Sequence, residues 1–198
     1  MDQFSITLLG QDGAGKTALA DRFTHNRFVE VPTSKPKQIY DPTIELYHKQ
    51  WAVDSAPCFI EVLDGSGSDE GMDSRLIDRY IRKGQGFFLM YSVASRDSFE
   101  VVDYFWKWVL RIKSETALLI LLATKCDWGA LGRAVPTEEG AALARQFGCP
   151  FLEVSAKTGI NVERAFSDLV RLLRQNTPEA TAPQESSERT GNKKCIVL

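Results

Sequence analysis

Short runs of apolar residues alternate along this chain with longer stretches in which apolar positions recur every three or four residues. The short runs have the length of strands, and strands of a parallel sheet are apolar on both faces because helices cover both sides. Strands that alternate with helices are typical of the α/β class. The six predicted strands are Phe4–Leu9, Ile44–Val53, Cys58–Leu63, Gly86–Ser92, Leu118–Thr124 and Phe151–Val154. We therefore expect an α/β domain with a six-stranded, mostly parallel sheet and helices on both faces.

Helical spacing is clearest in two stretches of the chain. The apolar positions are Phe99, Val102, Trp106, Val109 and Leu110 in the first, and Val162, Ala165, Phe166, Leu169 and Leu173 in the second. A third helix is expected to begin near Thr137, with the threonine as its cap and Glu138 and Glu139 in its first turn. We interpret Trp106 and Trp108 as one core side chain and one partly exposed ring, rather than as a platform for stacking bases.

The end of the chain differs in composition, because almost no apolar residues follow Thr177 until the last four positions. Such a segment cannot repay the conformational entropy that ordering would cost. We therefore predict one folded domain over residues 1–176 and a flexible tail over residues 177–198.

The bulk properties exclude several classes of protein. A length of 198 residues suits one domain, and a net charge of −2 gives no electrostatic basis for binding nucleic acid. The N-terminus lacks the features of a signal peptide, and no apolar run is long enough to cross a bilayer. The four cysteines are scattered without a C-x-x-C pair, which favours a reducing compartment and argues against disulfides or a zinc site.

The segment after the first predicted strand fits the phosphate-binding pattern G-x-x-x-x-G-K-[ST] and leads into a helix-forming stretch from Ala18. Its residues are Gly10, Gln11, Asp12, Gly13, Ala14, Gly15, Lys16 and Thr17. The glycines let successive backbone N–H groups face an anion, and the helix N-terminus adds partial positive charge. Lys16 would reach the β- and γ-phosphates, and the Thr17 hydroxyl would bind Mg²⁺. Asp12 is unusual because it places a carboxylate beside the phosphates.

Two later segments offer groups for the metal and the γ-phosphate. Asp64 ends an apolar strand and suits an acid that holds Mg²⁺ through water, while Gly67 lies where its N–H could face the γ-phosphate. Thr43 offers a second hydroxyl on a loop that could close over the metal. The predicted metal ligands are therefore Thr17 and Thr43 directly and Asp64 through water.

Two more segments suit recognition of a guanine base. Asp127 closes the segment that begins with Thr124 and Lys125, and its carboxylate can accept paired hydrogen bonds from the guanine edge. The segment Ser155, Ala156 and Lys157 offers a backbone N–H for the guanine carbonyl.

In this order, the segments resemble the Ras superfamily of small GTPases over about residues 4–175 and again at the last four residues. The Ras subfamily is the nearest match, because residues 40–45 resemble the Ras effector loop. The resemblance implies a P-loop NTPase fold, the Ras-like G domain, which binds GTP or GDP with Mg²⁺. It also implies a switch, in which the γ-phosphate draws Thr43 and Gly67 inward and orders two loops that relax on hydrolysis. By the same resemblance, Phe28 packs against the guanine.

Two departures from the Ras pattern bear on hydrolysis. Asp12 stands where Ras proteins have glycine, and a side chain there is expected to obstruct the arginine finger of a GTPase-activating protein (GAP) and the attacking water. Ser68 stands where Ras proteins have the glutamine that orients this water, and a serine is too short to reach it easily. The catalytic candidates are Lys16, Thr43, Gly67 and Ser68. We expect in-line attack of water on the γ-phosphate at or below the slow intrinsic Ras rate. The alternative for Asp12 is a solvated side chain on a tolerant loop.

Three further departures bear on recognition. Thr124 replaces an asparagine of Ras, but threonine also occurs there in Rho-type relatives, so guanine binding should survive. Residues 31–39 lengthen the first switch loop and form either a private partner surface or an inert insertion. Leu46 breaks the ending of the effector loop, so the known Ras effectors are not carried over.

The chain ends in Cys195-Ile196-Val197-Leu198, which fits the C-a-a-X prenylation motif, and the terminal leucine favours geranylgeranyl. Only Lys193 and Lys194 reinforce the lipid electrostatically, so we expect reversible attachment that a carrier protein could undo. The expected location is the cytoplasmic face of a membrane, namely the plasma membrane. The expected partners are an exchange factor, a GAP and effector proteins, with the chain itself a monomer that binds no nucleic acid.

The leading interpretation is a Ras-like GTPase with slow turnover that signals from a membrane. A second is a GTP-locked binding module with negligible turnover, controlled by expression, exchange or localisation. A third, an ATP-using P-loop kinase, leaves Asp127, the Ser155–Lys157 segment and Cys195 unexplained.

Overall fold

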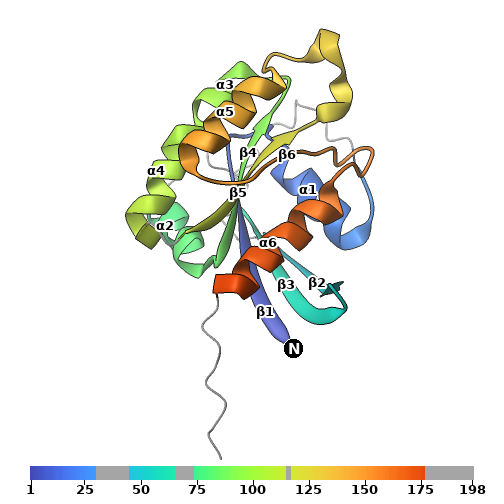
Figure 1. The fold of residues 1–198 in the computed structure, drawn as a ribbon, viewed down its shortest axis with the longest axis vertical. Helices are drawn as coiled ribbons and strands as arrows, with labels where there is room; N and C mark the ends of the chain where they lie inside the picture. Colours follow the sequence, from blue (N-terminus) through green and yellow to red (C-terminus); the bar gives the residue numbers. More distant parts are fainter. Residues whose placement is uncertain (30–44, 66–73, 115–116, 177–198) are drawn as a thin grey trace, which may run out of the picture.

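The computed structural model describes residues 1–29, 45–65, 74–114 and 117–176 (Figure 1). Its strands are β1 (Asp2–Leu9), β2 (Glu45–Val53), β3 (Ala56–Asp64), β4 (Gly86–Ser92), β5 (Leu118–Thr124) and β6 (Phe151–Glu153). They form one six-stranded sheet in the order β2-β3-β1-β4-β5-β6. Only β2 is antiparallel to its neighbour in this sheet, because a two-residue turn at Asp54 and Ser55 joins it to β3. The predicted six-stranded, mostly parallel α/β sheet is confirmed.

Helices cover both faces of the sheet, as the doubly apolar strands require. They are α1 (Lys16–His25), α2 (Ser74–Lys83), α3 (Arg96–Glu100), α4 (Val102–Lys113), α5 (Thr137–Phe147) and α6 (Val162–Asn176), with short 3₁₀ turns η2 (Cys126–Trp128) and η3 (Ala130–Gly132). The core on one face packs α1 and α6 against the sheet, and the core on the other face packs α2 to α5 (Figure 1). Among the described residues, no helix is long and apolar enough to cross a membrane.

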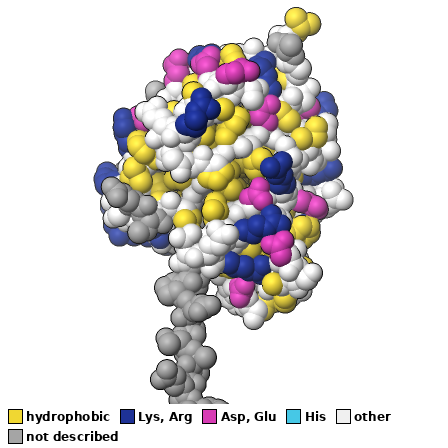
Figure 2. Space-filling model, viewed as in Figure 1, with side chains coloured by type: hydrophobic (Ala, Val, Ile, Leu, Met, Phe, Trp, Pro, Cys, Tyr) yellow, Lys and Arg dark blue, Asp and Glu magenta, His cyan; other side chains and the backbone are white. Residues whose placement is uncertain are grey.

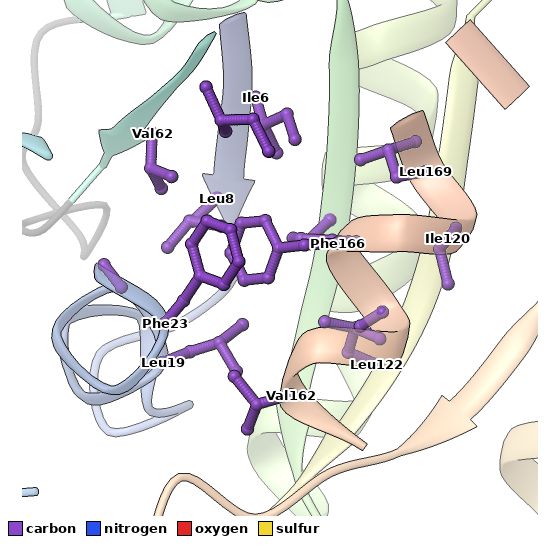
Figure 3. Packing of buried hydrophobic residues seen from close by; sticks show 14 of the residues in the cluster. Ile6, Leu8, Leu19, Phe23, Val62, Ile120, Leu122, Val162, Phe166 and Leu169 are labelled. Carbon is purple, nitrogen blue, oxygen red and sulfur yellow. The ribbon is translucent and has the colours of Figure 1, made fainter. Parts of the chain in front are cut away.

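The first of these cores is centred on an aromatic contact between α6 and α1. Phe166 stacks on Phe23 with ring centroids 3.6 Å apart, and it meets Phe88 of β4 edge-on at 5.0 Å. Figure 3 shows the two parallel rings, with Leu19 and Val162 beside them. All three aromatic side chains are fully buried, so α6 is held to α1 and to the middle of the sheet at one point.

The structure differs from the sequence-based expectation at three helices. Thr137 lies inside α5 and does not cap it, because Pro136 occupies the cap position and the Thr137 hydroxyl donates to Glu153 instead. The helical pattern expected through Phe99 is split into α3 and α4 at Val101, whose carbonyl accepts from the N–H three residues on. Helix α2 was not predicted at all.

The two tryptophans on α4 are arranged as predicted. Trp108 is buried in the second core, with its indole N–H donating to Asp78 of α2, while Trp106 is only partly buried. A ring that packs in this way offers no free face for a nucleic-acid base.

Replacing Phe166 by alanine should lower the free energy of unfolding by about 3–5 kcal/mol, because the change leaves a cavity against both neighbouring rings. Urea denaturation followed by circular dichroism measures this loss. Tyr104→Ala on exposed α4 surface is the matched control and should cost less than about 1 kcal/mol. Equal losses in the two variants would show that the Phe166 contact does not anchor α6.

Candidate nucleotide-binding site

Three of the segments singled out in the sequence meet at one edge of the sheet. Gly10 follows β1 directly, Asp64 is the last residue of β3, and Thr124 is the last residue of β5. Parallel strands end at the same edge, so these segments converge there although they lie far apart along the chain. This edge is the site that the sequence predicts.

Glycine is required at three points of the loop between β1 and α1. A Cβ on Gly10 would lie 2.2 Å from the carbonyl oxygen of Met90, so only glycine allows β1 and β4 to pack here. Gly13 and Gly15 have φ values of +79° and +88°, which side chains rarely adopt. Nothing lies within 4 Å of the position that a Gly13 Cβ would take, so the loop faces open space on that side. The loop thus has the backbone shape of a phosphate cradle.

Lys16 lies across this loop and is almost fully buried. Its Nζ donates to the carbonyl oxygens of Gly10 at 2.6 Å and of Gln11 at 3.0 Å. The Gln11 carbonyl also accepts the Ala14 N–H at 3.1 Å, so the amine lies against a closed turn of backbone. Its charge is therefore held at the cradle, where a nucleotide's phosphates would meet it.

Asp12 turns toward Lys16 and is not a side chain that points only to solvent. Its Oδ1 lies 3.8 Å from Lys16 Nζ, although 55% of the side chain is exposed. A half-exposed pair of this kind is screened by water and contributes at most about 1 kcal/mol. The carboxylate nevertheless occupies the mouth of the cradle, beside the predicted position of the phosphates.

The described residues also bring two of the three predicted metal ligands together. The Thr17 hydroxyl donates to Asp64 Oδ2 at 2.5 Å, and Asp64 is fully buried at the end of β3. A hydroxyl and a carboxylate are the hard oxygen ligands that Mg²⁺ prefers, and Mg²⁺ usually keeps several waters of its own. The donor set therefore fits Mg²⁺, with Thr17 and Asp64 as the residues that would hold it. Bound there, the ion would neutralise phosphate charge.

Thr124 connects the phosphate loop to the sheet. Its buried hydroxyl lies 2.7 Å from the carbonyl oxygen of Ala14 and 3.0 Å from that of Tyr91 on β4. In the described part of the structure, the Thr124 side chain therefore hydrogen-bonds to backbone of the phosphate loop and of β4. The sequence assigned Thr124 only to the base-recognition segment, so its role as a support for the phosphate loop is new.

The base-recognition segments form a second connected unit. Lys125 adopts a left-handed conformation with φ of +61°, which turns the chain from β5 into η2 and sets Asp127 at the site. The Ser155 hydroxyl donates to Asp127 Oδ1 at 2.6 Å and accepts the Thr158 N–H at 3.1 Å. Ser155 is fully buried, so its hydroxyl has little freedom to move and holds the Asp127 carboxylate in place. Burial lowers the pKa of Lys125, and the nearby Asp127 carboxylate opposes that shift.

The neighbours of these residues complete this end of the site. Ala156 is half-buried and Lys157 is exposed, in a loop closed by the bond from Gly159 N–H to the Ser155 carbonyl. They directly follow Ser155, whose hydroxyl contacts Asp127, and the role of their backbone in base recognition stays a prediction.

Helix α1 ends close to the predicted guanine-stacking residue. Asp21 accepts hydrogen bonds from Arg27 Nε at 2.8 Å and interacts with His25 Nδ1 at 2.9 Å, which fixes the path of the chain out of the helix. Burial raises the pKa of Asp21, but the hydrogen bonds from Arg27 and His25 outweigh it and lower the pKa overall. Phe28 follows and is half-buried, as is Ala18 near the start of the helix.

Several predicted residues lie outside the described residues, and their roles stay predictions. They are Thr43, Gly67, Ser68, Cys195 and the insertion at 31–39.

Sequence reasoning missed two side chains that support the site, Ser155 and Thr124. Ser155 was assigned a backbone role only, and its hydroxyl contact with Asp127 crosses 28 positions of the chain. The contact of Thr124 with Ala14 crosses 110 positions. Local spacing carries no signal for contacts of this range.

Comparison with known proteins agrees with this geometry. The family model described as "Ras family" matches residues 5–175. A "Ras-like protein" of Laccaria bicolor is 39% identical in a match covering 98% of this chain and 89% of the relative. "Ras-like protein 1" of Pyricularia oryzae is also 39% identical, over 94% of this chain and 82% of the relative.

Replacing Ser155 by alanine should speed GDP release about tenfold. The change removes the hydrogen bond to the Asp127 carboxylate, and bonds to charged groups contribute about 1.5–3 kcal/mol. Stopped-flow release of a fluorescent GDP analogue measures the rate. Ser167→Ala, the same change on α6 away from the site, should leave the rate unaltered. An unchanged rate in Ser155→Ala would mean that Asp127 is held without this hydroxyl.

Replacing Thr124 by valine keeps the shape of the side chain but removes the hydroxyl that reaches Ala14. We expect the free energy of unfolding to fall by about 1–3 kcal/mol and GDP release to accelerate. Thr124→Ser retains the hydroxyl and should release GDP within about threefold of the wild-type rate. If the valine and serine variants behave alike in thermal unfolding and in GDP release, the hydroxyl is not the support inferred above.

Proposed function

Since this chain belongs to the Ras family of small GTPases, we propose that it is a guanine-nucleotide switch that hydrolyses GTP slowly and signals from a membrane. The family binds GTP and GDP with Mg²⁺. The proposal concerns the rate, the location and the residues that carry each step. The observation that carries the slow rate is the Asp12 carboxylate at the mouth of the cradle, 3.8 Å from Lys16 Nζ.

In this proposal the two halves of the site bind the two ends of the nucleotide. Gly13, Gly15 and Lys16 hold the phosphates, and Thr17 with Asp64 holds Mg²⁺. Asp127 selects guanine over adenine, because a carboxylate accepts from the two N–H donors of the guanine edge, which adenine lacks. The backbone of Ala156 and the ring of Phe28 would complete the contact with the base, and Thr43 the contact with the metal.

The effect of Asp12 on nucleotide binding is expected to be much smaller than its effect, together with Ser68, on the rate of hydrolysis. Breaking the Asp12–Lys16 pair, worth at most about 1 kcal/mol, costs nucleotide binding no more than about fivefold. In Ras, by contrast, the arginine finger with the water-orienting glutamine raises hydrolysis about 10⁵-fold. Asp12 obstructs the approach to the γ-phosphate, and Ser68 replaces the glutamine. Binding therefore survives while hydrolysis stays slow, and we place the rate at or below about 4 × 10⁻⁴ s⁻¹, the intrinsic rate of Ras.

The membrane part of the proposal rests on the C-terminal motif. The Cys195 sulfur would displace diphosphate from geranylgeranyl diphosphate, forming a thioether as the thiol proton is lost. A single lipid chain gives reversible attachment. Exchange factor, GAP and effectors would then act at the cytoplasmic face, with residues 31–39 as a surface that Ras itself lacks.

A second candidate is a GTP-locked binding module that turns over negligibly. The position of Asp12 favours it, because a carboxylate in the cradle disfavours the charge that builds up on the γ-phosphate oxygens during transfer. The two candidates differ in rate alone.

Single-turnover hydrolysis of radiolabelled GTP decides between them. The wild-type protein should hydrolyse GTP at or below about 4 × 10⁻⁴ s⁻¹, and negligible turnover would favour the locked module. The double variant Asp12→Gly with Ser68→Gln restores the Ras residues and should regain Ras-like acceleration by a GAP.

The matched controls are the two single variants, which test each departure separately. Asp12→Asn removes the charge and keeps the size, so it separates electrostatic from steric obstruction. An intrinsic rate in the wild-type protein clearly above about 4 × 10⁻⁴ s⁻¹, or acceleration of the wild-type protein by a GAP as large as that of the double variant, would overturn the interpretation of both departures.

A further inference from the structure

A groove on the side of the molecule is lined by apolar side chains from four elements. It lies between α4, the end of α5, the start of β5 and α6, and has a volume of about 420 Å³. Its lining residues are Trp106, Leu110, Ala117, Leu118, Leu119, Phe147, Gly148, Cys149, Pro150 and Leu172. Figure 2 shows a band of apolar side chains on this face of the molecule. The volume falls within the range of about 300–1,000 Å³ that is usual for ligand pockets.

Among the described residues, no charged side chain lines this groove. One wall is the ring of Trp106 stacked on Phe147, with centroids 4.4 Å apart and planes within 8°. Burial raises the pKa of Cys149 to about 11, so its thiol stays neutral at physiological pH. The described side chains of the groove therefore suit an apolar chain, which contacts them without desolvating a charged group.

The end of the described chain lies close to this groove. Leu172 lines it from α6 and precedes Asn176, the last residue of that helix, by about one turn. Cys195 follows Asn176 by 19 residues. Nineteen residues of chain can extend over as much as about 60 Å, far more than the single helical turn between Asn176 and Leu172, so a group on Cys195 can reach the groove.

We infer that the groove between α4, α5 and α6 binds the isoprenoid chain carried on Cys195 of the same molecule. The inference rests on the lipidation proposed above. The covalent tether makes this chain the favoured occupant, because it holds the lipid at an effective concentration of about 1 mM. In the groove the lipid is shielded from water, so the protein leaves the membrane more readily.

The expected change in membrane binding follows from the dissociation constant of the lipid and the effective concentration of the tethered lipid at the groove. A membrane binds a single myristoyl chain with a constant of about 10⁴ M⁻¹, and we take the groove to hold its chain equally strongly, with a dissociation constant of roughly 0.1 mM. With the tether at about 1 mM, the groove form outweighs the free-lipid form about tenfold. Blocking the groove should therefore raise membrane partitioning about tenfold.

Photocrosslinking tests the occupant directly. The full chain, loaded at Cys195 in vitro with a benzophenone-bearing isoprenoid, is irradiated without membranes and digested with trypsin. We expect intramolecular adducts in the peptides spanning residues 114–125 and 146–157, which contain groove residues. Adducts at Trp106, Leu110 or Leu172 would also lie in the groove, whereas adducts only at residues that do not line it, or dimers whose yield rises with protein concentration, would overturn the inference.

Vesicle partitioning tests the consequence. Leu110→Glu and Leu172→Glu place a charge in the groove from two different helices. Each geranylgeranylated variant should bind neutral phosphatidylcholine vesicles about tenfold more strongly than the wild type. Leu131→Glu, at a fully exposed leucine outside the groove, is the matched control and should bind as the wild type does. Binding of a fluorescent GDP analogue confirms that each variant is folded.

The test of lipid binding in the groove can be distinguished from the test of whether Cys195 is lipidated. Mass spectrometry of the protein made in eukaryotic cells shows whether Cys195 carries a lipid, whereas the enzymatically loaded protein tests the groove in either case. Equal vesicle binding by wild type and both groove variants would overturn the inference even if Cys195 proves to be lipidated.

Discussion

The nucleotide site depends on one buried hydroxyl, that of Thr124. It lies 2.7 Å from the carbonyl of Ala14 in the phosphate loop and 3.0 Å from that of Tyr91 in the sheet. The next residue, Lys125, turns the chain into the segment that presents Asp127. The hydroxyl thus fixes the distance between the part of the site that faces phosphates and the part that faces the base. Because a buried hydrogen bond is costly to leave unmade, this distance is strongly determined.

Much of this arrangement could be predicted from the sequence, since it follows from local pattern. The apolar runs gave β4 and β5 at the residues observed, because strands covered on both faces must be apolar throughout. The glycine pattern gave the left-handed turns of the phosphate loop. The prediction that Thr137 caps α5 was wrong, because its hydroxyl donates to Glu153, which lies 16 residues further along the chain. Helix α2 was not predicted, although Ile77, Tyr80 and Ile81 have helical spacing. Contacts between segments far apart in the sequence, such as that of Thr137 with Glu153, could not be predicted from the local pattern.

Binding and cleavage of the nucleotide place different demands on the same loop. Binding needs backbone N–H groups and a buried cation, which the glycines and Lys16 supply. Cleavage needs an open approach to the γ-phosphate and a side chain that orients water. In the function proposed above, Asp12 leaves the first set intact because its ion pair is half-exposed and weak, but would obstruct that approach. On that proposal, one exposed carboxylate separates two functions that usually occur together.

The apolar groove and the nucleotide site are joined by a single helix. Helix α6 starts at Val162, beside the base-recognition loop, and reaches the groove at Leu172, about 15 Å further along. If a lipid in the groove changed the affinity for nucleotide, the nucleotide would change the affinity for the lipid by the same factor. Such coupling would need a structural element, here α6, that can adopt two different conformations. Stacking of the buried Phe166 on Phe23 holds α6 in one arrangement. Occupation of the groove should therefore follow competition with the membrane and not the bound nucleotide.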